Sequence, residues 1–571
     1  MKPRSIKSSE IQNKKHPKKS EIATKSPLMS GMTLLIILLC IIVFSPISNN
    51  GFTNWDDPTY IENNHLIKDL SGENISKIFS EPFFSNYQPI HLLSYAIEYH
   101  FFQLNPAGYH IVSLIMHLIV VLLIIQLSFI LVKEKWVAYT SGLLFALHPM
   151  HVESVAWASE RKDLLYAIFF FTALIYYCYY LQKRENKFLY LTFFFFLLSA
   201  FSKAMAASFP LALIAYDLFY KRKDIKRLVL EKIPFLLVAV IFGFISYSIS
   251  SSDGSIAGTD RFSLLDRFFY ASGNLLMYCI KLLVPFKLSA YYPYPDKESS
   301  IMIFYYCAPL IIAIVLFLII RNKEKMPLLF FSAAFFVATI ILVLQLIPVG
   351  PTVFSERYSY IPSFSFFLFL SFYFIKFFSL PKFKQPLLIC GIAYVVLISF
   401  TTFQRNKIWN NSLALWNNVI DQFPRALHAV NNRADAYFKQ NNFNEAIVDF
   451  TSAIEIDPSY AEAYYNRGNT YGIIGEMDNA FSDFNQAIML DQNYAEAYNR
   501  RAQVFASQGK INEAIEDFKK ASQLDDNPEF MYSLAITYLN IGQKEQACMI
   551  LSTQKQLQHP PSFDLFQQAC R

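Results

Sequence analysis

Two adjacent carboxylates, Asp56 and Asp57, follow the first long apolar run of the chain, within the stretch NWDDPTYIENN (54–64). An ionised aspartate can take the proton from an incoming hydroxyl group and so act as a general base. Asp before Pro is also a common turn opener, which makes an ordinary polar loop the alternative interpretation. The acids become candidates for catalysis only together with other functional groups on the same side of the protein.

Such groups occur at the ends of other apolar segments. Charges at membrane depth are costly unless they are paired or face water, so they mark candidate functional sites. Cations stabilise the negative charge that grows on a departing phosphate, and phosphate leaves without a general acid. The combination therefore suits transfer from a lipid-linked phosphate. The segments LHPMHVESVAWASERKDLL, FSKAMAASFP and FSERYSYIP supply His148, His151, Glu153, Arg161, Lys162, Lys203, Glu356, Arg357 and Tyr358.

Each of these groups also has a plainer interpretation. His148 and His151 lie near a single Glu, and no HExxH or comparable ligand set is present, so no metal site is predicted. The ERKD run (160–163) could be a mutually neutralising surface cluster. Paired acids are compatible with Mg²⁺ or Mn²⁺, but we expect no obligatory metal or other cofactor.

The composition places these residues in a membrane protein. Of 571 residues, 54% are apolar and 17% aromatic. A run of about 20 apolar residues crosses a bilayer, and about eleven such runs are present. The predicted spans are roughly 30–48, 109–132, 137–157, 164–182, 188–202, 205–220, 233–250, 301–320, 327–347, 362–378 and 386–403. The net charge of +6 lies mostly at the cytoplasmic ends of spans, so no nucleic-acid partner is predicted.

The loop charges predict the topology. A basic tail (1–29) precedes an uncleaved anchor, and the connections KEK, KRENK, KRKDIKR, RNKEK and KFFSLPKFK alternate as Lys/Arg-rich inner loops. This alternation requires that the segment 262–286, which contains Lys281, does not cross the membrane completely. The first outer loop (49–108), the ERKD run and the C-terminus are then all predicted outside.

The C-terminal part is repetitive. After a linker (404–426), residues 427–562 repeat with a period of about 34, which is typical of tetratricopeptide (TPR) repeats. About four copies are predicted, followed by a tail (563–571). Such arrays present concave surfaces to extended peptides. Arg433, Arg467 and Arg501 recur in register, so they either bind an acceptor or are solvated repeat residues. Cys548 and Cys570 are close enough in sequence to pair.

WDDPTYIENN, HVESVAWASERKD, SKAMAASFPLALIAYD and ERYSYIP, in this order before TPR repeats, resemble the transmembrane and TPR-containing (TMTC-type) O-mannosyltransferases. The resemblance implies an all-α GT-C fold with a C-terminal α-solenoid, and a base at Asp56 or Asp57. It also implies donor-phosphate binding by Arg161, Lys162, Lys203 and Arg357. His148, His151, Glu153, Glu356 and Tyr358 would shape the site. Relatives often have Asp at the position of Glu356 and a basic residue or His at Gln88.

The leading hypothesis is an inverting glycosyltransferase. It would transfer a hexose such as mannose from a polyprenyl- or dolichyl-phosphate to a hydroxyl of a protein or glycan, and the TPRs would hold the acceptor. The alternatives are a membrane-anchored TPR scaffold for envelope assembly and, less favoured because the charges gather at one face, a transporter. A bacterial inner membrane is the expected location, or the endoplasmic reticulum if the chain is eukaryotic.

Overall fold

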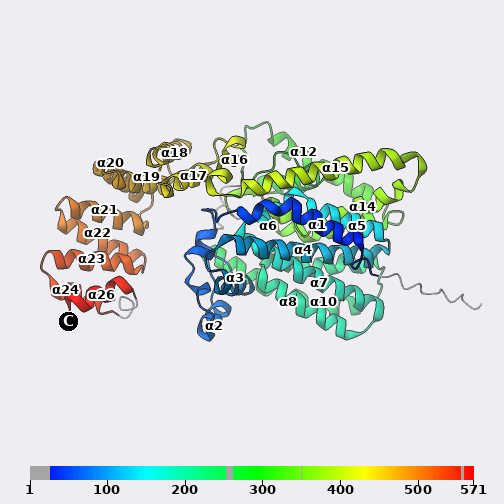
Figure 1. Ribbon diagram of the computed structural model, residues 1–571, viewed down its shortest axis with the longest axis horizontal. Coiled ribbons are helices and arrows are strands. Elements are labelled where there is room, and N and C mark those ends of the chain that lie inside the picture. Colours follow the sequence, from blue (N-terminus) through cyan, green and yellow to red (C-terminus); the bar gives the residue numbers. More distant parts are fainter. Residues whose placement is uncertain (1–25, 253–261, 349, 554–558, 571) are drawn as a thin grey trace, which may run out of the picture.

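The computed structural model describes residues 26–252, 262–348, 350–553 and 559–570. Figure 1 shows a body of helices that run roughly side by side and, beyond it, a curved array of short helix pairs. The only β-strands in the described ranges are β1 (Tyr292–Pro293) and β2 (Thr352–Phe354), which pair antiparallel. The predicted all-α membrane architecture with a C-terminal solenoid is thus confirmed.

Among the described residues, six helical segments are long and apolar enough to cross a membrane. They contain α1 (Gly31–Phe44), α4 (Pro106–Val132), α7 (Arg161–Lys183), α10 (Ile225–Ser252), α12 (Met302–Arg321) and α15 (Pro381–Ile408). Shorter apolar helices accompany them: α8 (Asn186–Ser202), α9 (Phe209–Phe219), α13 (Pro327–Ile340) and α14 (Ser363–Phe378). The count of about eleven spans remains a prediction.

The predicted span 137–157 is not one continuous helix. Helix α5 (Lys135–Leu147) stops at His148, whose backbone is extended ahead of Pro149. A residue before proline is pushed out of the helical region, which explains the break. A 3₁₀ turn (Pro149–His151), the short helix α6 (Val152–Ala156) and a second 3₁₀ turn (Ala158–Glu160) then lead into α7. The backbone between α5 and α7 is therefore irregular, and several of the candidate site residues lie in or next to this segment.

The segment 262–286 forms helix α11 (Leu264–Leu283), which begins with a capping box between Ser263 and Asp266. It is absent from the helices that meet the length and hydropathy needed to span. The predicted first outer loop (49–108) contains α2 (Gly72–Ser80) and α3 (Pro89–Phe102). Whether α11 crosses the bilayer stays a prediction.

Helix pairs α17/α18, α19/α20, α21/α22 and α23/α24 form the C-terminal array after α16 (Ser412–Gln422). Their bounds are Leu427–Lys439, Phe443–Ile456, Ala461–Ile473, Met477–Leu490, Ala495–Ser507, Ile511–Leu524, Pro528–Asn540 and Lys544–Leu551. Ala446, Ala480, Ala514 and Ala547 are fully buried, so these small residues lie where paired helices approach. Gly475, Gly509 and Gly542 supply the positive φ that the turn inside three of the pairs requires.

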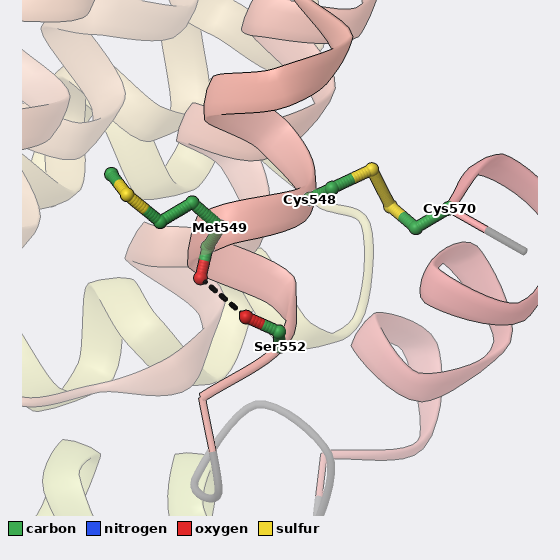
Figure 2. The surroundings of a disulfide bond; sticks show 4 residues. All are labelled: Cys548, Met549, Ser552 and Cys570. Carbon is green, nitrogen blue, oxygen red and sulfur yellow. Dashed lines mark hydrogen bonds between the residues drawn. A yellow bond between two sulfur atoms is a disulfide. The ribbon is translucent and has the colours of Figure 1, made fainter.

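Helix α26 (Pro560–Ala569) closes the array. A disulfide joins Cys548 on α24 to Cys570 just after α26 (Figure 2). Their Cα atoms are 5.6 Å apart, an ordinary separation for a disulfide. The bond attaches the last helix to the repeat before it, which confirms that these two cysteines can pair.

Candidate active site

Asp57 is buried and fully engaged. Its carboxylate accepts hydrogen bonds from the Thr53 backbone N–H (2.7 Å) and hydroxyl (3.0 Å) and from the Ser159 N–H (2.9 Å) and hydroxyl. Burial raises the pKa of Asp57, although the bonds from Ser159 and Thr53 work in the opposite direction. Asp57 therefore fastens the first outer loop to the turn that precedes α7.

Asp56 has a different environment. Its side chain is partly exposed, and no hydrogen bond to its carboxylate is present within the described residues. Burial raises the pKa of Asp56 to about 6, and the nearby ammonium of Lys162 limits the rise. A carboxylate with this pKa is mostly ionised at neutral pH and is a stronger base than an exposed aspartate. Of the two adjacent acids, Asp56 has its oxygens available.

Three cations gather around one carboxylate, Glu160, and two of them, Lys162 and Arg357, are close enough to Asp56 to lower its pKa. The Glu160 oxygens lie 3.1 Å from Lys162 Nζ, 3.4 Å from Lys203 Nζ and 3.4 Å from Arg357 Nε. Lys203 also binds Asp163 at 2.6 Å, and Arg357 binds Glu153. The side chains of Lys162, Lys203 and Arg357 are 9, 9 and 14% exposed. The ERKD run is therefore not a surface cluster, since its charged side chains are buried.

Aromatic rings border this cationic group. Lys162 lies 5.0 Å from the ring centre of Tyr60, Lys203 lies 5.5 Å from that of Tyr358, and the Arg357 guanidinium lies 4.9 Å from Tyr358. Cations close to aromatic faces gain electrostatic stabilisation, most of all where water is excluded. The rings thus hold the ammonium and guanidinium groups in place without adding negative charge.

Arg161 is not part of this group. Its guanidinium binds Glu98 and donates to the Tyr109 carbonyl at 2.7 Å, between the rings of Tyr95 and Tyr109. Successive helical residues are about 100° apart around the axis, so Arg161 and Lys162 point to different sides of α7. This geometry supports a structural role for Arg161.

The remaining predicted residues, His148, His151 and Glu356, are buried. His151 is fully buried and bonds to the Phe145 carbonyl (2.8 Å) and the Ser363 hydroxyl (3.0 Å). His148 is also fully buried, with its Nδ1 3.4 Å from the Met150 N–H. Glu356 binds Arg405 at 2.8 Å and accepts from the Tyr292 hydroxyl at 2.6 Å. Its partners are therefore not the three cations around Glu160. Among the described residues, no group of His, Cys, Asp and Glu is arranged to hold a metal ion.

From the sequence, the groups that organise the site were recognised only as part of the charged ERKD run, with no role of their own. Glu160 and Asp163 are three residues apart, which places both on one face of a helix turn, and this spacing is a usable signal. Nothing in the sequence shows that Ser159 meets Asp57, because the two are separated by 102 positions.

The loop that carries the acids contacts the first repeat. Asn54 donates from Nδ2 to the Asn432 carbonyl (2.7 Å) and to the Asp435 carboxylate (2.8 Å), both on α17. Its Oδ1 accepts from Trp416 Nε1 at 2.8 Å, and its backbone N–H donates to the Ser412 hydroxyl at 2.9 Å. Asn54 therefore joins α16 and α17 to the chain just before Asp56.

The recurrent arginines of the repeats have partners inside the array. Arg433, Arg467 and Arg501 each hold the carboxylate of the residue 16 positions later, Asp449, Asp483 and Asp517, through two hydrogen bonds of 2.7–2.9 Å. These bidentate pairs join the two helices of a repeat and account for the recurrence. Acceptor binding by these arginines remains a hypothesis.

Known protein families match the repeat region of the chain. Family models described as "TPR repeat" and "Tetratricopeptide repeat" match residues 434–472 and residues 461–494 and 495–528. Similar solved structures include MamA (24% identity, 24% of this chain and 81% of that chain, TM-score 0.23). Another is a thermophilic TPR protein of Thermus thermophilus (21% identity, 33% of this chain and 98% of that chain, TM-score 0.25).

Curated relatives are similar over part of the chain. Protein O-mannosyl-transferase TMTC2 of Homo sapiens is 35% identical over 94 residues, which cover 16% of this chain and 11% of the relative. TMTC4 of Homo sapiens is 28% identical over 200 residues, or 30% of this chain and 26% of the relative. The F38B6.6 protein O-mannosyl-transferase of Caenorhabditis elegans is 29% identical over 155 residues, or 25% and 22%. The matched regions thus span between a tenth and about a quarter of these relatives, and the resemblance to TMTC-type transferases is confirmed.

Proposed function

We propose that this protein is a membrane glycosyltransferase that moves a hexose, mannose in the first instance, from a polyprenyl-phosphate donor to a hydroxyl group of a protein. The observation that carries the proposal is the Asp56 carboxylate, which has a raised pKa and no hydrogen-bond donor within the described residues, close to Lys162 and Arg357 of the cationic group around Glu160. The similarity to TMTC protein O-mannosyl-transferases supports the same activity.

In the proposed reaction, Asp56 takes the proton of a Ser or Thr hydroxyl. The hydroxyl oxygen attacks the anomeric carbon, and the bond from that carbon to the phosphate oxygen breaks. The electron pair leaves with the polyprenyl phosphate. A single displacement of this kind inverts the configuration at the anomeric carbon. No second carboxyl group is needed, because the phosphate departs as an anion.

Lys162, Lys203 and Arg357 are the proposed phosphate ligands. Their charges are offset by Glu153, Glu160 and Asp163, so the site is close to neutral before the donor arrives. A bound phosphate would compete with Glu160 for the three cations. Arg357 has the most exposed side chain of the three, and its fork of N–H donors suits a phosphate oxygen pair.

Asp57 is assigned a positioning role, because its hydrogen bonds to Thr53 and Ser159 fix the turn that carries Asp56. The buried His148, His151, Glu356 and Arg161 would support the site. By the charge rule, the site and the TPR array are proposed to lie on the outer face of the membrane. That membrane is proposed to be a bacterial inner membrane, or the endoplasmic reticulum in a eukaryote.

The test is a transfer assay with the purified protein in lipid bilayers, several polyprenyl-phosphate sugars and Ser/Thr peptides. Wild type should transfer one sugar, and Asp56→Asn should lose transfer while it still inserts and binds donor. Full activity in the Asp56→Asn and Asp57→Asn variants would contradict the proposal. It would favour the scaffold alternative, in which the acidic loop plays no chemical part.

A further inference from the structure

A large groove lies where the membrane body meets the first repeat. Its volume is 1460 Å³, and it is lined by the connection between α11 and α12, the end of α15, the turn from α16 to α17 and the turn from α18 to α19. Tyr291, Tyr294 and Asp296 come from the first of these segments, and His428 and Tyr460 come from the repeat side. The groove is therefore built jointly by the body and the array.

We propose that this groove binds the acceptor polypeptide as an extended segment and directs one hydroxyl-bearing residue past Trp55 to Asp56. The inference rests on the proposed function and adds to it the acceptor's class and its path. It assigns acceptor binding to the junction between the body and the array, and not to the recurrent arginines of the repeats.

A continuous series of ring contacts connects the groove with Asp56. The ring centres of Tyr460 and His428 are 5.6 Å apart, those of His428 and Tyr291 are 6.0 Å apart, and those of Tyr291 and Trp55 are 6.5 Å apart. Trp55 is the residue before Asp56. An extended chain advances about 3.3–3.6 Å per residue, so about five residues would separate the segment at Tyr460 from the reacting hydroxyl.

On its other side, Trp55 reaches the cationic group. Its ring stacks on Trp157 at 4.5 Å, and the Arg357 guanidinium lies 5.5 Å from the Trp157 ring. Trp55 thus stands between the groove and the proposed phosphate ligands. A hydroxyl that reaches Asp56 from the groove would pass the Trp55 ring before it meets the cationic group.

The lining suits a peptide better than a phosphate or a lipid tail. Two of its cations are already occupied: Lys281 donates to the carbonyls of Phe286 and Lys287 at 3.2 and 3.0 Å, and Arg405 binds Glu356. The exposed charges at the rim are of both signs, among them Asp296, Asp421 and Arg425. Phenol rings with dispersed charges of both signs are typical of surfaces that contact peptide side chains and backbone.

Strand β2 divides the groove from the proposed donor site. Val353 and Phe354 line the groove, whereas Arg357, just beyond the strand, belongs to the cationic group and does not. The Phe354 ring stacks at 4.2 Å on the ring of the buried Tyr278, so this part of the strand is packed against α11. Donor and acceptor would therefore enter from different sides.

Photo-crosslinking in the full-length protein in bilayers tests the groove directly. Benzoylphenylalanine replaces Tyr294 or Tyr460 in the groove, or Val448 on α18, which is 63% exposed and serves as the matched control. The probe is a library of peptides with one central threonine, each long enough to fill the groove, added with polyprenyl-phosphate mannose. We expect crosslinks from positions 294 and 460 and none from 448. For position 460 the crosslink should fall about five residues from the threonine.

The kinetics of variants provide a second test of the groove. Tyr460→Ala should raise the peptide KM by about tenfold, as is typical when an aromatic anchor is lost, without a change in donor KM. Arg425→Glu, an exposed change that leaves the core intact, should alter which peptides are preferred according to their charge. Val448→Ala should alter neither value.

The outcomes separate the two proposals. In the first case, wild type transfers sugar but crosslinks form only at 448, or excess polyprenyl phosphate removes the crosslinks at 294 and 460. The groove is then not the acceptor site, while the transferase proposal stands. If peptides crosslink at 294 and 460 but no donor sugar is transferred, the groove is a peptide site and the transferase proposal is overturned.

Discussion

Asn54 binds the Asp435 carboxylate at 2.8 Å, and this hydrogen bond connects the first outer loop of the membrane body with the first TPR helix, only two residues before Asp56. The same side chain bonds to the Asn432 carbonyl and to Trp416. A side chain with three such bonds fixes both elements relative to each other. The array is therefore held at the site and not merely tethered to it.

The contacts of Asn54 predict that its loss weakens the binding of long acceptor peptides. Asn54→Ala removes three hydrogen bonds that are partly shielded from water, each worth about 1 kcal/mol. Transfer to long peptides should fall several-fold through KM, whereas transfer to a short threonine peptide should change little. Asp435→Ala should show the same pattern in a weaker form, and equal losses for long and short peptides in both variants would contradict the coupling.

The two aspartates should behave differently on substitution. Asp57→Asn replaces one acceptor oxygen by an NH₂ group that meets N–H donors from Thr53 or Ser159, so it should destabilise the fold by about 1–3 kcal/mol. Its thermal midpoint and its yield should both fall. Asp56→Asn should fold normally, and a scan of thermal unfolding that ranks the variants the other way would reverse the assignment.

Asp56 should also carry a cost in stability. Its folded pKa of about 6 lies above the ordinary value near 3.8, so the fold favours the protonated form. Stability is therefore lost as pH rises from about 4 through about 6, and Asp56→Asn removes that loss. The variant should be more stable than wild type at pH 7 by up to about 3 kcal/mol and no more stable at pH 4. Equal unfolding free energies of variant and wild type at both pH values would show that the fold does not favour the protonated form of Asp56.

The pH dependence of transfer follows from the same group. A base must be ionised to accept a proton, so kcat/KM should fall below an apparent pKa of about 6. A rate that stays level down to pH 4 would exclude Asp56 as the base. Rates measured with saturating donor and limiting peptide give the required profile.

Variants of Arg161 can show whether this residue supports the fold or binds the donor. Arg161→Met alone leaves Glu98 buried without its partner, which should cost about 3–5 kcal/mol and lower the yield of folded protein. The double variant Arg161→Met with Glu98→Leu should recover yield and transfer. Recovered yield without recovered transfer would show that Arg161 acts on the donor after all.

Much of the architecture is predictable from sequence because it follows simple periodicities. Apolar runs predict membrane helices, and the repeat of about 34 residues predicts the TPR array. The gathering of Lys162, Lys203 and Arg357 agrees with the expectation that their segments share one membrane face.

The parts that could not be predicted depend on helical phase and on long-range contacts. Arg161 and Lys162 are neighbours in sequence but point into different surroundings, and Asp57 differs from Asp56 because Ser159 lies beside it. No residue pattern within either segment contains that information. The central role of Glu160 was not predicted for the same reason, since its three cations come from three separate places in the chain.

The most direct test of the central claim is a parallel measurement of transfer rate and donor affinity for Asp56→Asn and wild type in bilayers with polyprenyl-phosphate mannose. Loss of a general base typically costs about 10²–10⁴-fold in rate. We predict a loss in that range, with donor affinity within about threefold of wild type, because the phosphate ligands Lys162, Lys203 and Arg357 are intact. A variant that transfers mannose at the wild-type rate would contradict the account.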